Sequence, residues 1–296
     1  MRPRLPAVDE TVVAVIATYR PCSNVVDLVR VVRDMVDRLV VVDDASPCTY
    51  DTTFGEMPLV ANEEVWRFSD NRGIARSLNV GLRLATEMGA PWLLTLDQDS
   101  QLPDSYVHNL LADARRATGE GMRVGVIAPR EITDRAGTIT YPETWIDGWL
   151  VTAEVLQSGA LWSVEALNHL GGFNEDLGMD AVDAAACLAL REKGYRVLLS
   201  TNCTFEHQWG NGSRFTFLGK SVAVTGHSPA RRTTIIRNRI RLMPREFRES
   251  PVQGFRSLRR LVVGTGLALT VEDGRRQKLW AVIQGLNIRA GSWRGQ

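Results

Sequence analysis

Short apolar runs of strand length alternate with segments of helical period through the first half of the chain. The runs 12–17, 39–42 and 92–96 are rich in β-branched or bulky apolar residues, as the buried strands of a parallel sheet are. Between them, segments 25–36 and 74–88 carry apolar residues at helical spacing. This alternation predicts an α/β fold with a mainly parallel central sheet and helices on both faces.

The rest of the chain continues the pattern and then changes character. Further strands are expected at 65–68, 124–128, 196–200 and 203–206, and further helices at 104–117, 164–170 and 182–193. After Pro229 the sequence is basic and helical, with breaks expected near Pro244, Pro251 and Gly274. We therefore divide the chain into a main domain, 1–229, and a basic helical C-terminal extension, 230–296.

Charge is distributed unevenly in a chain of ordinary globular composition. Of 296 residues, 44% are apolar and 23% charged, and the formal net charge is only +1. Residues 230–296 hold 15 Lys and Arg against 4 Asp and Glu, which leaves 20 basic and 30 acidic residues in the rest. Such a tail suits an anionic partner, either a membrane surface or nucleic acid, although a solvated helical face explains it equally well.

Cysteine spacing and hydropathy point to a cytoplasmic protein. The four cysteines show no C-x-x-C spacing and are expected to be reduced thiols. No apolar run is long enough to cross a bilayer; the best candidate, 261–269, is short and flanked by charges.

Polar side chains follow three of the expected strands at the points where these strands end. Tyr19 follows the first, Asp43 and Asp44 end the second, and Asp97 and Asp99 end the third. Ligands of open α/β sheets bind beyond the carboxyl ends of the strands. Two carboxylates at i and i+2 of an extended segment point the same way and could hold Mg²⁺ or Mn²⁺, whose usual second partner is a diphosphate. A chance Asp-x-Asp in a surface loop is the alternative.

The order of these features resembles the inverting family 2 glycosyltransferases of the GT-A fold, especially their rhamnosyltransferase-like branch. The most specific matching run is Leu94-Thr95-Leu96-Asp97-Gln98-Asp99-Ser100. The other matching stretches are 17–19, 41–46, 71–75 with Leu78-Asn79, Ser158-Gly159, 171–177, 180–183, 193–195, His207, Asn238-Arg239 and 284–291. The resemblance covers nearly the whole chain and implies the GT-A fold.

On this resemblance, the first half of the chain would bind a nucleotide sugar. Tyr19 would stack on the base, and Asp44, with Asp43 beside it, would accept hydrogen bonds from the base or ribose. Arg72 or Arg76 would neutralise the diphosphate. The alternatives are a half-buried strand-end tyrosine, a turn-forming aspartate and ordinary surface arginines.

The resemblance also implies a metal site and a general base. Asp97, Asp99 and His207 would hold the Mg²⁺ or Mn²⁺ ion, which stabilises charge on the leaving nucleoside diphosphate. Asp183 would take the proton from the acceptor hydroxyl as that oxygen attacks the anomeric carbon. Asp180 lies three residues earlier, and on one helical turn its carboxylate would raise the pKa of its neighbour. Alternatively, both acids simply favour a helix N-terminus.

The sequence departs from its relatives just after this expected base. Ala184-Ala185-Ala186 replaces an acid and the residues that usually follow it, although Arg191 remains. This departure concerns the acceptor pocket more than the donor site. It leaves open a catalytically impaired nucleotide-sugar-binding or scaffold protein of the same fold. A nucleotidyltransferase is a weaker alternative, because only Arg20 is available near its expected phosphate-binding loop.

The expected activity is metal-dependent, inverting transfer of a sugar, with L-rhamnose the leading candidate. The donor would be dTDP-rhamnose or a UDP-sugar, and the acceptor a cell-surface glycan or a lipid-linked precursor. Helices such as 255–261, with Arg256, Arg259 and Arg260, would touch an anionic membrane at its inner face. Nucleic acid is not an expected partner, because the arginines are not interleaved with stacking aromatics. A homo-oligomer is compatible with the sequence.

Overall fold

The computed structural model describes residues 11–57, 59–134, 137–207, 213–217, 220–224 and 226–287. Contacts divide the chain into two compact units. The first contains Met1–Thr133, Thr138–Gly178 and Val182–His207, and the second contains Asp134–Gly137, Met179–Ala181 and Gln208–Gln296. The boundary at 229 expected from composition coincides with the first residue of a long helix, whereas the contacts group the chain from residue 208 with that helix.

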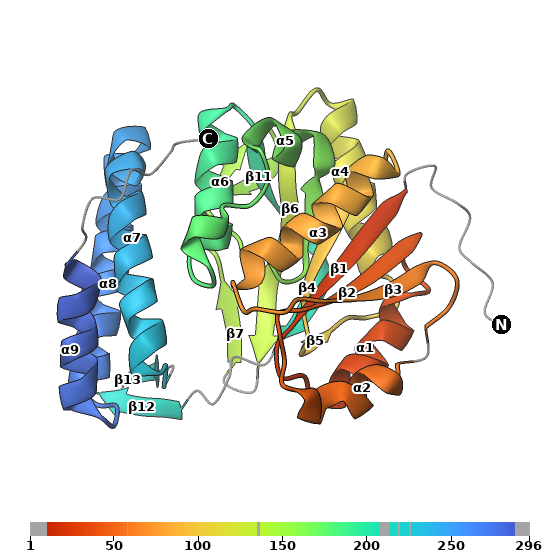
Figure 1. Ribbon diagram of the computed structural model, residues 1–296. Helices are drawn as coiled ribbons and strands as arrows, with labels where there is room; N and C mark the ends of the chain where they lie inside the picture. Colours follow the sequence, from red (N-terminus) through yellow and green to blue (C-terminus); the bar gives the residue numbers. More distant parts are fainter. Residues whose placement is uncertain are drawn as a thin grey trace. The chain divides into compact units, whose positions relative to one another are not determined.

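The first unit is built on an eleven-stranded sheet (Figure 1). Its main path runs β3 (Glu63–Arg67), β2 (Arg38–Asp43), β1 (Val12–Thr18), β4 (Trp92–Asp97), β10 (Ala160–Ser163), β6 (Val124–Asp134), β11 (Arg196–His207), β9 (Trp149–Thr152) and β8 (Glu143–Ile146). Two strands lie off this path: β5 (Ser100–Gln101) pairs with β11, and β7 (Gly137–Thr140) pairs with β6.

The sheet is parallel at one side and mixed at the other. The four strands β3, β2, β1 and β4 are parallel neighbours, and β6 and β11 form a second parallel pair. Between these groups lies β10, which is antiparallel to both β4 and β6. The strands expected at 196–200 and 203–206 form one strand, β11, with an irregular register between Ser200 and Thr204. The α/β class with a central sheet is therefore confirmed. The expectation of a mainly parallel sheet is wrong, because β10, β9 and β8 pair antiparallel with their neighbours. The parallel part is the part that the alternating pattern predicted.

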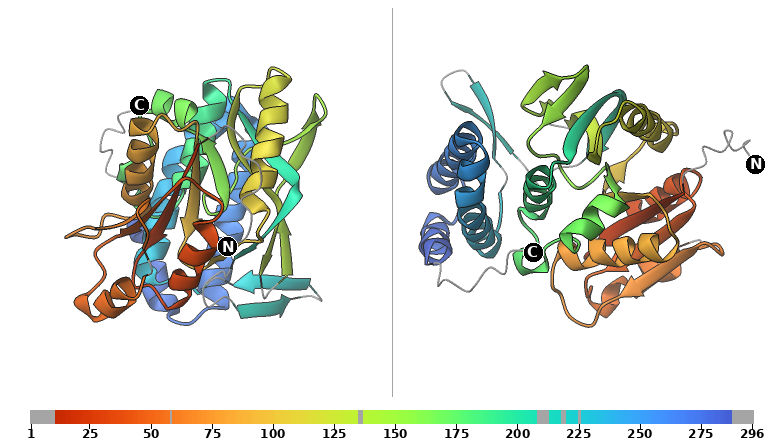
Figure 2. Two further views of the ribbon diagram at one scale, coloured as in Figure 1. Left: turned by 90° about the vertical axis from the view of Figure 1, so that its right-hand side faces the viewer. Right: turned by 90° about the horizontal axis from the view of Figure 1, so that it is seen from above.

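Helices cover both faces of this sheet (Figure 2). On one face α1 (Asn24–Val32) and α4 (Tyr106–Gly119) bury their apolar sides against the inward residues of β1, β2 and β4. The other face carries α3 (Ile74–Glu87), α5 (Val164–Leu170) and α6 (Val182–Glu192). The short helices η1 (Cys48–Tyr50), α2 (Asp51–Gly55) and η2 (Glu175–Leu177) lie in the connections.

Two local features of the sequence position α3 and α5. Gly81 lets α3 approach β1 closely, because a Cβ there would lie 2.6 Å from Cβ of Val15. Ser163 caps α5 by accepting a 3.2 Å hydrogen bond from the backbone N–H of Ala166.

The second unit holds a hairpin and three helices. The hairpin pairs β12 (Ser213–Phe217) with β13 (Lys220–Val224), and α7 (Pro229–Glu249) packs against both α8 (Pro251–Thr270) and α9 (Arg275–Leu286). The breaks expected near Pro251 and Gly274 are confirmed. The break expected at Pro244 is wrong, because Pro244 lies inside α7, where packing against two helices outweighs the lost backbone hydrogen bond.

A buried ion cluster accounts for part of the basic charge of this unit. Glu272 accepts from Nζ of Lys278 at 2.5 Å and from Nη2 of Arg232 at 3.4 Å, and all three residues are buried. Arg232 and Lys278 therefore neutralise a buried carboxylate and do not present their charge to a partner at the surface. Among the described helices, none has an apolar stretch of the length that a membrane span requires.

Candidate functional site

The carboxyl ends of β1, β2 and β4 meet at one edge of the sheet. The parallel register pairs Thr18 with Asp43 and Ala17 with Asp97, so the polar residues that end these strands are brought to neighbouring positions. The loop after β1 is tied to the turn after β4, because the backbone N–H of Tyr19 donates to Oε1 of Gln98 at 2.9 Å. This is the edge at which α/β sheets bind ligands.

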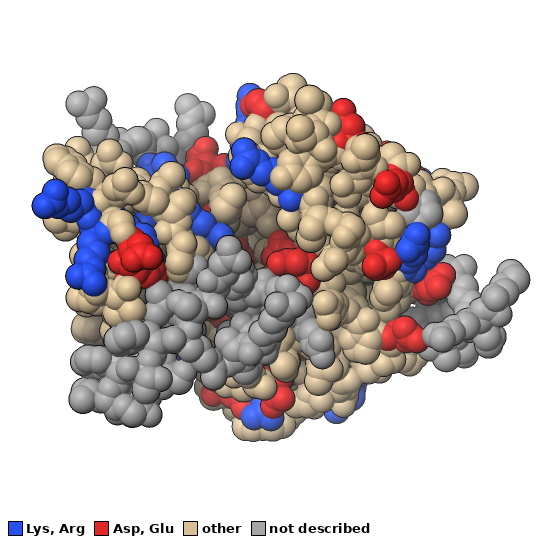
Figure 3. Space-filling view, turned by 90° about the horizontal axis from the view of Figure 1, so that it is seen from below, with Lys and Arg blue, Asp and Glu red and all other residues tan. Residues whose placement is uncertain are grey.

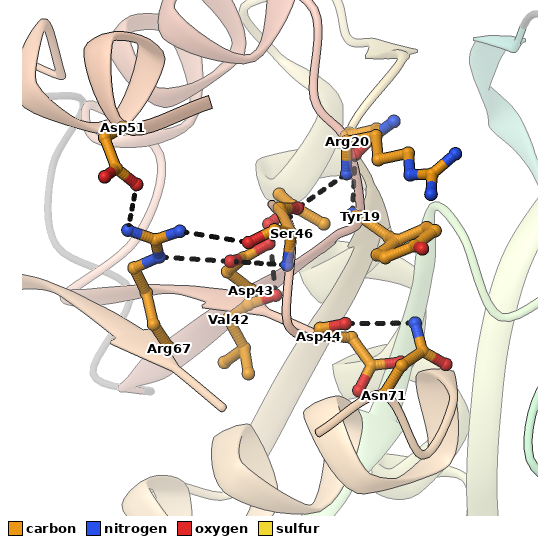
Figure 4. Close-up of polar contacts among 11 residues, drawn as sticks. Tyr19, Arg20, Val42, Asp43, Asp44, Ser46, Asp51, Arg67 and Asn71 are labelled. Atoms are coloured by element: carbon orange, nitrogen blue, oxygen red, sulfur yellow. Dashed lines mark hydrogen bonds and ion pairs between the residues drawn. The ribbon is translucent and has the colours of Figure 1, made fainter. Parts of the chain in front are cut away.

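Asp43 is a buried carboxylate that organises the loop after β2 (Figure 4). It accepts hydrogen bonds from the backbone N–H of Ser46 at 3.1 Å, from its hydroxyl at 2.5 Å and from Nε of Arg67 at 3.1 Å. Oγ of Ser46 in turn accepts from the backbone N–H of Arg20 at 2.7 Å. Asp43 thereby helps to fix the loop that carries Tyr19. This tyrosine is 36% exposed, and the guanidinium of Arg20 lies 5.0 Å from the centroid of its ring, so a flat ligand that stacks there would share the ring with Arg20 or displace it.

Asp44 is also buried and holds the turn that precedes α3. Its two carboxylate oxygens accept from the backbone N–H groups of Arg72 at 2.9 Å and Gly73 at 2.7 Å, and its carbonyl accepts from Nδ2 of Asn71 at 3.0 Å. Each carboxylate oxygen has a second lone pair, so these contacts leave acceptor capacity on Asp44.

The two arginines expected at the diphosphate share one acidic partner. Asp70 accepts from Nε of Arg72 and, at 3.2 Å, from Nη1 of Arg76, whose guanidinium also lies 3.9 Å above the ring of Phe68. Hydrogen bonds from both arginines lower the pKa of Asp70, and the hydrogen bond between Arg72 and Asp70 raises the pKa of Arg72. A phosphate at this turn would therefore compete with Asp70 for both guanidinium groups.

Asp97 is gripped by the segment just before β10. Nε2 of Gln157 donates to Oδ1 of Asp97 at 2.5 Å, and the backbone N–H of Asp97 donates to Oγ of Ser158 at 2.9 Å. The hydroxyl of Ser158 also lies 2.9 Å from that of Ser100. Residues 157 and 158 thus form a bracket around the Asp97–Ser100 segment.

Gln157 is a site residue that the sequence reasoning missed. Its side chain is buried, and among the residues that the structure covers its Oε1 has no hydrogen-bond partner. A glutamine in front of Ser158-Gly159 belongs to no motif with a chemical role. Its position next to that matched pair was the one feature of the sequence that pointed to Gln157. Sequence alone does not reveal that the pair lies against Asp97.

Asp99 lies in the turn between β4 and β5, outside either strand. The alternation of side chains along a strand therefore does not extend from Asp97 to Asp99, which corrects the geometric argument made from the sequence. The third expected ligand approaches from another strand, because the β5–β11 register places the backbone of His207 opposite Ser100. The side chain of His207 lies outside the described residues.

No three His, Cys, Asp or Glu side chains gather in a metal-binding arrangement within the part of the chain that the structure describes. The observed chemistry still suits a hard cation: two half-buried carboxylates stand within three residues at the end of a buried strand. The expected set Asp97, Asp99 and His207 therefore stays a prediction.

Asp183 lies in the first turn of α6, where the helix dipole favours a negative charge. Its Oδ1 accepts from the backbone N–H of Ala184 at 2.7 Å. Burial raises the pKa of Tyr141, and the charge of Asp183 raises it further, so the two groups lie within electrostatic range. The hydroxyl of Tyr141 accepts from the backbone N–H of Leu156 at 3.1 Å, next to Gln157. Tyr141 therefore lies near Asp183 and beside the segment that carries Gln157.

Asp180 does not share a helical turn with Asp183. The helix begins at Val182, and Ala181 adopts a left-handed φ of +66°, so the expected pairing on one turn is wrong. Asp180 belongs with the second unit, where Nε of Arg231 donates to its Oδ1 at 3.2 Å and Nδ2 of Asn238 donates to its carbonyl at 2.7 Å. Burial raises the pKa of Asp180, against the opposing effect of Arg231.

Several other matched residues have structural roles. Asn79 of α3 donates from Nδ2 to the carbonyl of Phe173 at 2.9 Å and accepts from its N–H at 2.8 Å. A Cβ at Gly73 would lie 2.4 Å from the carbonyl carbon of Gly178, so only glycine allows this close approach. The alanines 184–186 are buried in the packing of α6, which gives their small size a structural reason.

Comparisons with known proteins agree with this architecture. Residues 13–134 match the sequence model of Glycosyl transferase family 2. The chain is 26% identical over 255 residues to dTDP-rhamnosyl transferase RfbF of Shigella flexneri. The match covers 79% of this chain and 80% of that protein.

Solved structures share the fold at low sequence identity. The mannosyltransferase PcManGT of Pyrobaculum calidifontis, in complex with GDP-Man and Mn²⁺, is 17% identical with a TM-score of 0.53, over 94% of this chain and 73% of that one. S. aureus TarS 1–349 in complex with UDP-GlcNAc is 16% identical with a TM-score of 0.54, over 93% and 81%. GalNAc-T7 with UDP, GalNAc and Mn²⁺ is 14% identical with a TM-score of 0.57; the matched part is 79% of this chain and about half, 48%, of that one. The fold is thus that of the GT-A glycosyltransferases.

Proposed function

We propose that this chain, a glycosyltransferase whose residues 13–134 form a family 2 domain, moves L-rhamnose from dTDP-rhamnose onto a cell-surface glycan or its lipid-linked precursor. The observation that carries the proposal is the meeting of Tyr19, Asp44 and Asp97 at one edge of a GT-A sheet. The choice of rhamnose is supported by the Shigella flexneri relative, which is named as a dTDP-rhamnosyl transferase. Residues 1–229 would carry the transfer chemistry and 230–296 the basic extension.

The donor would lie across the ends of β1, β2 and β4. In this proposal the exposed ring of Tyr19 stacks on the nucleotide base, and Asp44, supported by the loop that Asp43 organises, accepts a hydrogen bond from base or ribose. Arg72 and Arg76 turn from Asp70 toward the diphosphate when the donor binds.

A divalent cation, Mg²⁺ or Mn²⁺, fits the donor set at the end of β4. We assign Asp97, Asp99 and His207 as its ligands, and Gln157 as the residue that orients Asp97. When bound, the cation stabilises the negative charge that develops on the leaving nucleoside diphosphate. Two structural relatives were solved with Mn²⁺, which supports the assignment of a cation.

Asp183 is the proposed general base for a single displacement. The acceptor oxygen forms a bond to the anomeric carbon while the bond from that carbon to the diphosphate oxygen breaks. The acceptor's hydroxyl proton passes to the carboxylate of Asp183, and the nucleoside diphosphate leaves with the bonding electron pair. Asp180, the second acid assigned to the acceptor side, would act through the backbone that leads into α6 rather than by touching the sugar.

A lipid-linked acceptor would place the reaction at a membrane. We propose that the enzyme works in the cytoplasm, on the inner face of the membrane, with its basic helices toward anionic lipid. Nucleic acid has no part in the proposal, and self-association is left to the experiments below.

A thermal-shift screen followed by product detection tests the proposed donor. We expect dTDP-rhamnose with Mn²⁺ to raise the melting temperature more than UDP-sugars or GDP-mannose do, because binding stabilises the folded state by mass action. Asp97→Asn and Asp99→Asn should each remove the Mn²⁺-dependent part of the shift. The proposal fails if no nucleotide sugar raises the melting temperature of the wild type. A larger shift and turnover with a UDP-sugar would replace rhamnose as the donor.

A further inference from the structure

The outward side of α8 carries large apolar side chains although it faces solvent. Val252, Phe255, Val262 and Val263 are each between 52% and 64% exposed. They recur at intervals of three, seven and eight residues and therefore lie along one side of the helix. The opposite side is buried through small residues, Gly254, Ser257 and Ala268.

The neighbouring helix α9 repeats this arrangement. Leu279, Trp280, Ile283 and Leu286 are between 49% and 65% exposed, while Lys278, Ala281 and Gly285 are buried. Close packing explains the inner side, because a Cβ at Gly285 would lie 2.8 Å from Cβ of Ile236 in α7. No packing in the described part of the molecule explains the outer side.

The two exposed sides belong to adjacent helices. α8 contacts α9, and both lie on the same side of α7 in the views of Figures 1 and 2. We call the eight residues Val252, Phe255, Val262, Val263, Leu279, Trp280, Ile283 and Leu286 the α8–α9 face. Soluble monomers rarely leave so many large apolar side chains together in water unless the surface binds something.

Exposed arginines accompany this face. Arg256, Arg259 and Arg260 on α8, with Arg275 and Arg276 on α9, are all exposed. The acids between 251 and 287 are Glu272, which is buried in its ion cluster, and Asp273. On the face of the second unit that Figure 3 draws, basic side chains lie together with acidic ones. Apolar and guanidinium groups together match the headgroup region of an anionic bilayer, which offers phosphates above acyl chains.

We infer that the α8–α9 face inserts into the surface of an anionic lipid bilayer, with its apolar side chains below the headgroups and its arginines at the phosphates. The inference rests on the proposed function only for the claim that the acceptor is linked to a lipid of this membrane. A second copy of the chain fits this face less well, because a two-fold contact would bring the arginines of both copies together.

Vesicle flotation with the full chain tests the insertion. We expect binding to phosphatidylcholine vesicles with 30% phosphatidylglycerol to exceed binding to pure phosphatidylcholine by about tenfold or more, since each arginine near the surface adds to the attraction. Trp280→Ser with Ile283→Ser should lower the partition coefficient about tenfold at unchanged melting temperature. Arg256→Gln, Arg259→Gln and Arg260→Gln together should abolish the preference for the anionic lipid. Trp145→Ser is the matched control, because Trp145 is 67% exposed on β8 and lies in the other unit.

Fluorescence quenching shows whether the face enters the bilayer. Lipids brominated on the acyl chain should quench a part of the wild-type emission that is missing in Trp280→Phe, which keeps the apolar ring for binding. Binding that is absent, that is insensitive to these variants, or that leaves Trp280 unquenched overturns the inference. A dimer in light scattering that Trp280→Ser dissolves would assign the face to self-association instead. Thermal shifts with the sugar-nucleotide donor on the same variants separate the two proposals. Membrane insertion stands even if no donor binds, and donor binding stands even if the face does not insert.

Discussion

The side-chain amide of Gln157 donates a 2.5 Å hydrogen bond to the carboxylate of Asp97. One residue further on, the hydroxyl of Ser158 accepts from the backbone N–H of the same aspartate. The segment before β10 therefore sets both the position and the side-chain orientation of Asp97. Because β10 runs antiparallel between two parallel groups of strands, this contact depends on the feature of the sheet that local sequence patterns express least.

Removing the amide should loosen Asp97 without touching the donor. Gln157→Leu is expected to weaken Mn²⁺ binding and turnover by about 10–100-fold, the usual cost of losing a partner of a metal ligand. Titration of turnover with Mn²⁺ measures this, and a merely structural role would lower the melting temperature while leaving the Mn²⁺ dependence unchanged. Gln277→Leu, at an exposed position in α9, is the control and should behave as wild type.

The glycine of the same segment makes a sharper test of packing. Gly159 has φ of +81°, and a Cβ there would lie 2.7 Å from the hydroxyl oxygen of Tyr106, which donates to the carbonyl of Gly159 at 2.6 Å. Gly89 has φ of +66° but open space around it. Gly89→Ala should cost only the backbone strain of about 1–2 kcal/mol, whereas Gly159→Ala adds a clash and should cost more. Equal losses in denaturant unfolding would show that Tyr106 moves aside freely.

The strands and most helices of the first unit are readable from local patterns because their buried faces follow simple periods. The runs 12–17, 39–42 and 92–96 each became a buried strand. The antiparallel insertion of β10 was not predictable in this way, since pairing between distant segments leaves no periodic signal. The uninterrupted α7 was missed for a related reason, because tertiary packing overrides the local preference of Pro244.

The site was predicted unevenly for physical reasons. The ends of buried strands can be recognised in a sequence, because a polar residue follows an apolar run. The proximity of Tyr19, Asp43 and Asp97 therefore followed from the order of elements. The separation of Asp180 from the helix of Asp183 did not, because a left-handed alanine at 181 has no signature in sequence. Gln157 was missed because a buried amide acquires meaning only through its partner.

Acid should weaken the second unit through one histidine. Burial and the nearby charges of Arg231 and Arg232 lower the pKa of His227 to about 4. Its unfolded value is near 6.5, so between these values the unfolded chain binds more protons than the folded one. The stability that His227 contributes is thus fully present above pH 6.5 and is lost as the pH falls through 4.

Melting curves from pH 7 to pH 4 measure this effect. We expect the melting temperature to fall less steeply with acid in His227→Asn than in wild type. His108→Asn, at an exposed position on α4, should retain the wild-type slope. A slope unaffected by His227→Asn would show that the imidazole protonates without cost in the fold.

The central claim is that Asp183 acts as the base toward the acceptor, while the donor is bound at the ends of β1, β2 and β4. Transfer from dTDP-rhamnose, followed by NMR of the product, measures both the rate and the configuration at the anomeric carbon. We predict an inverted product from the wild type and a turnover about 10²–10⁴-fold lower for Asp183→Asn, with the donor-induced thermal shift unchanged. Full turnover by Asp183→Asn, or a product that retains the donor's configuration, would contradict the account.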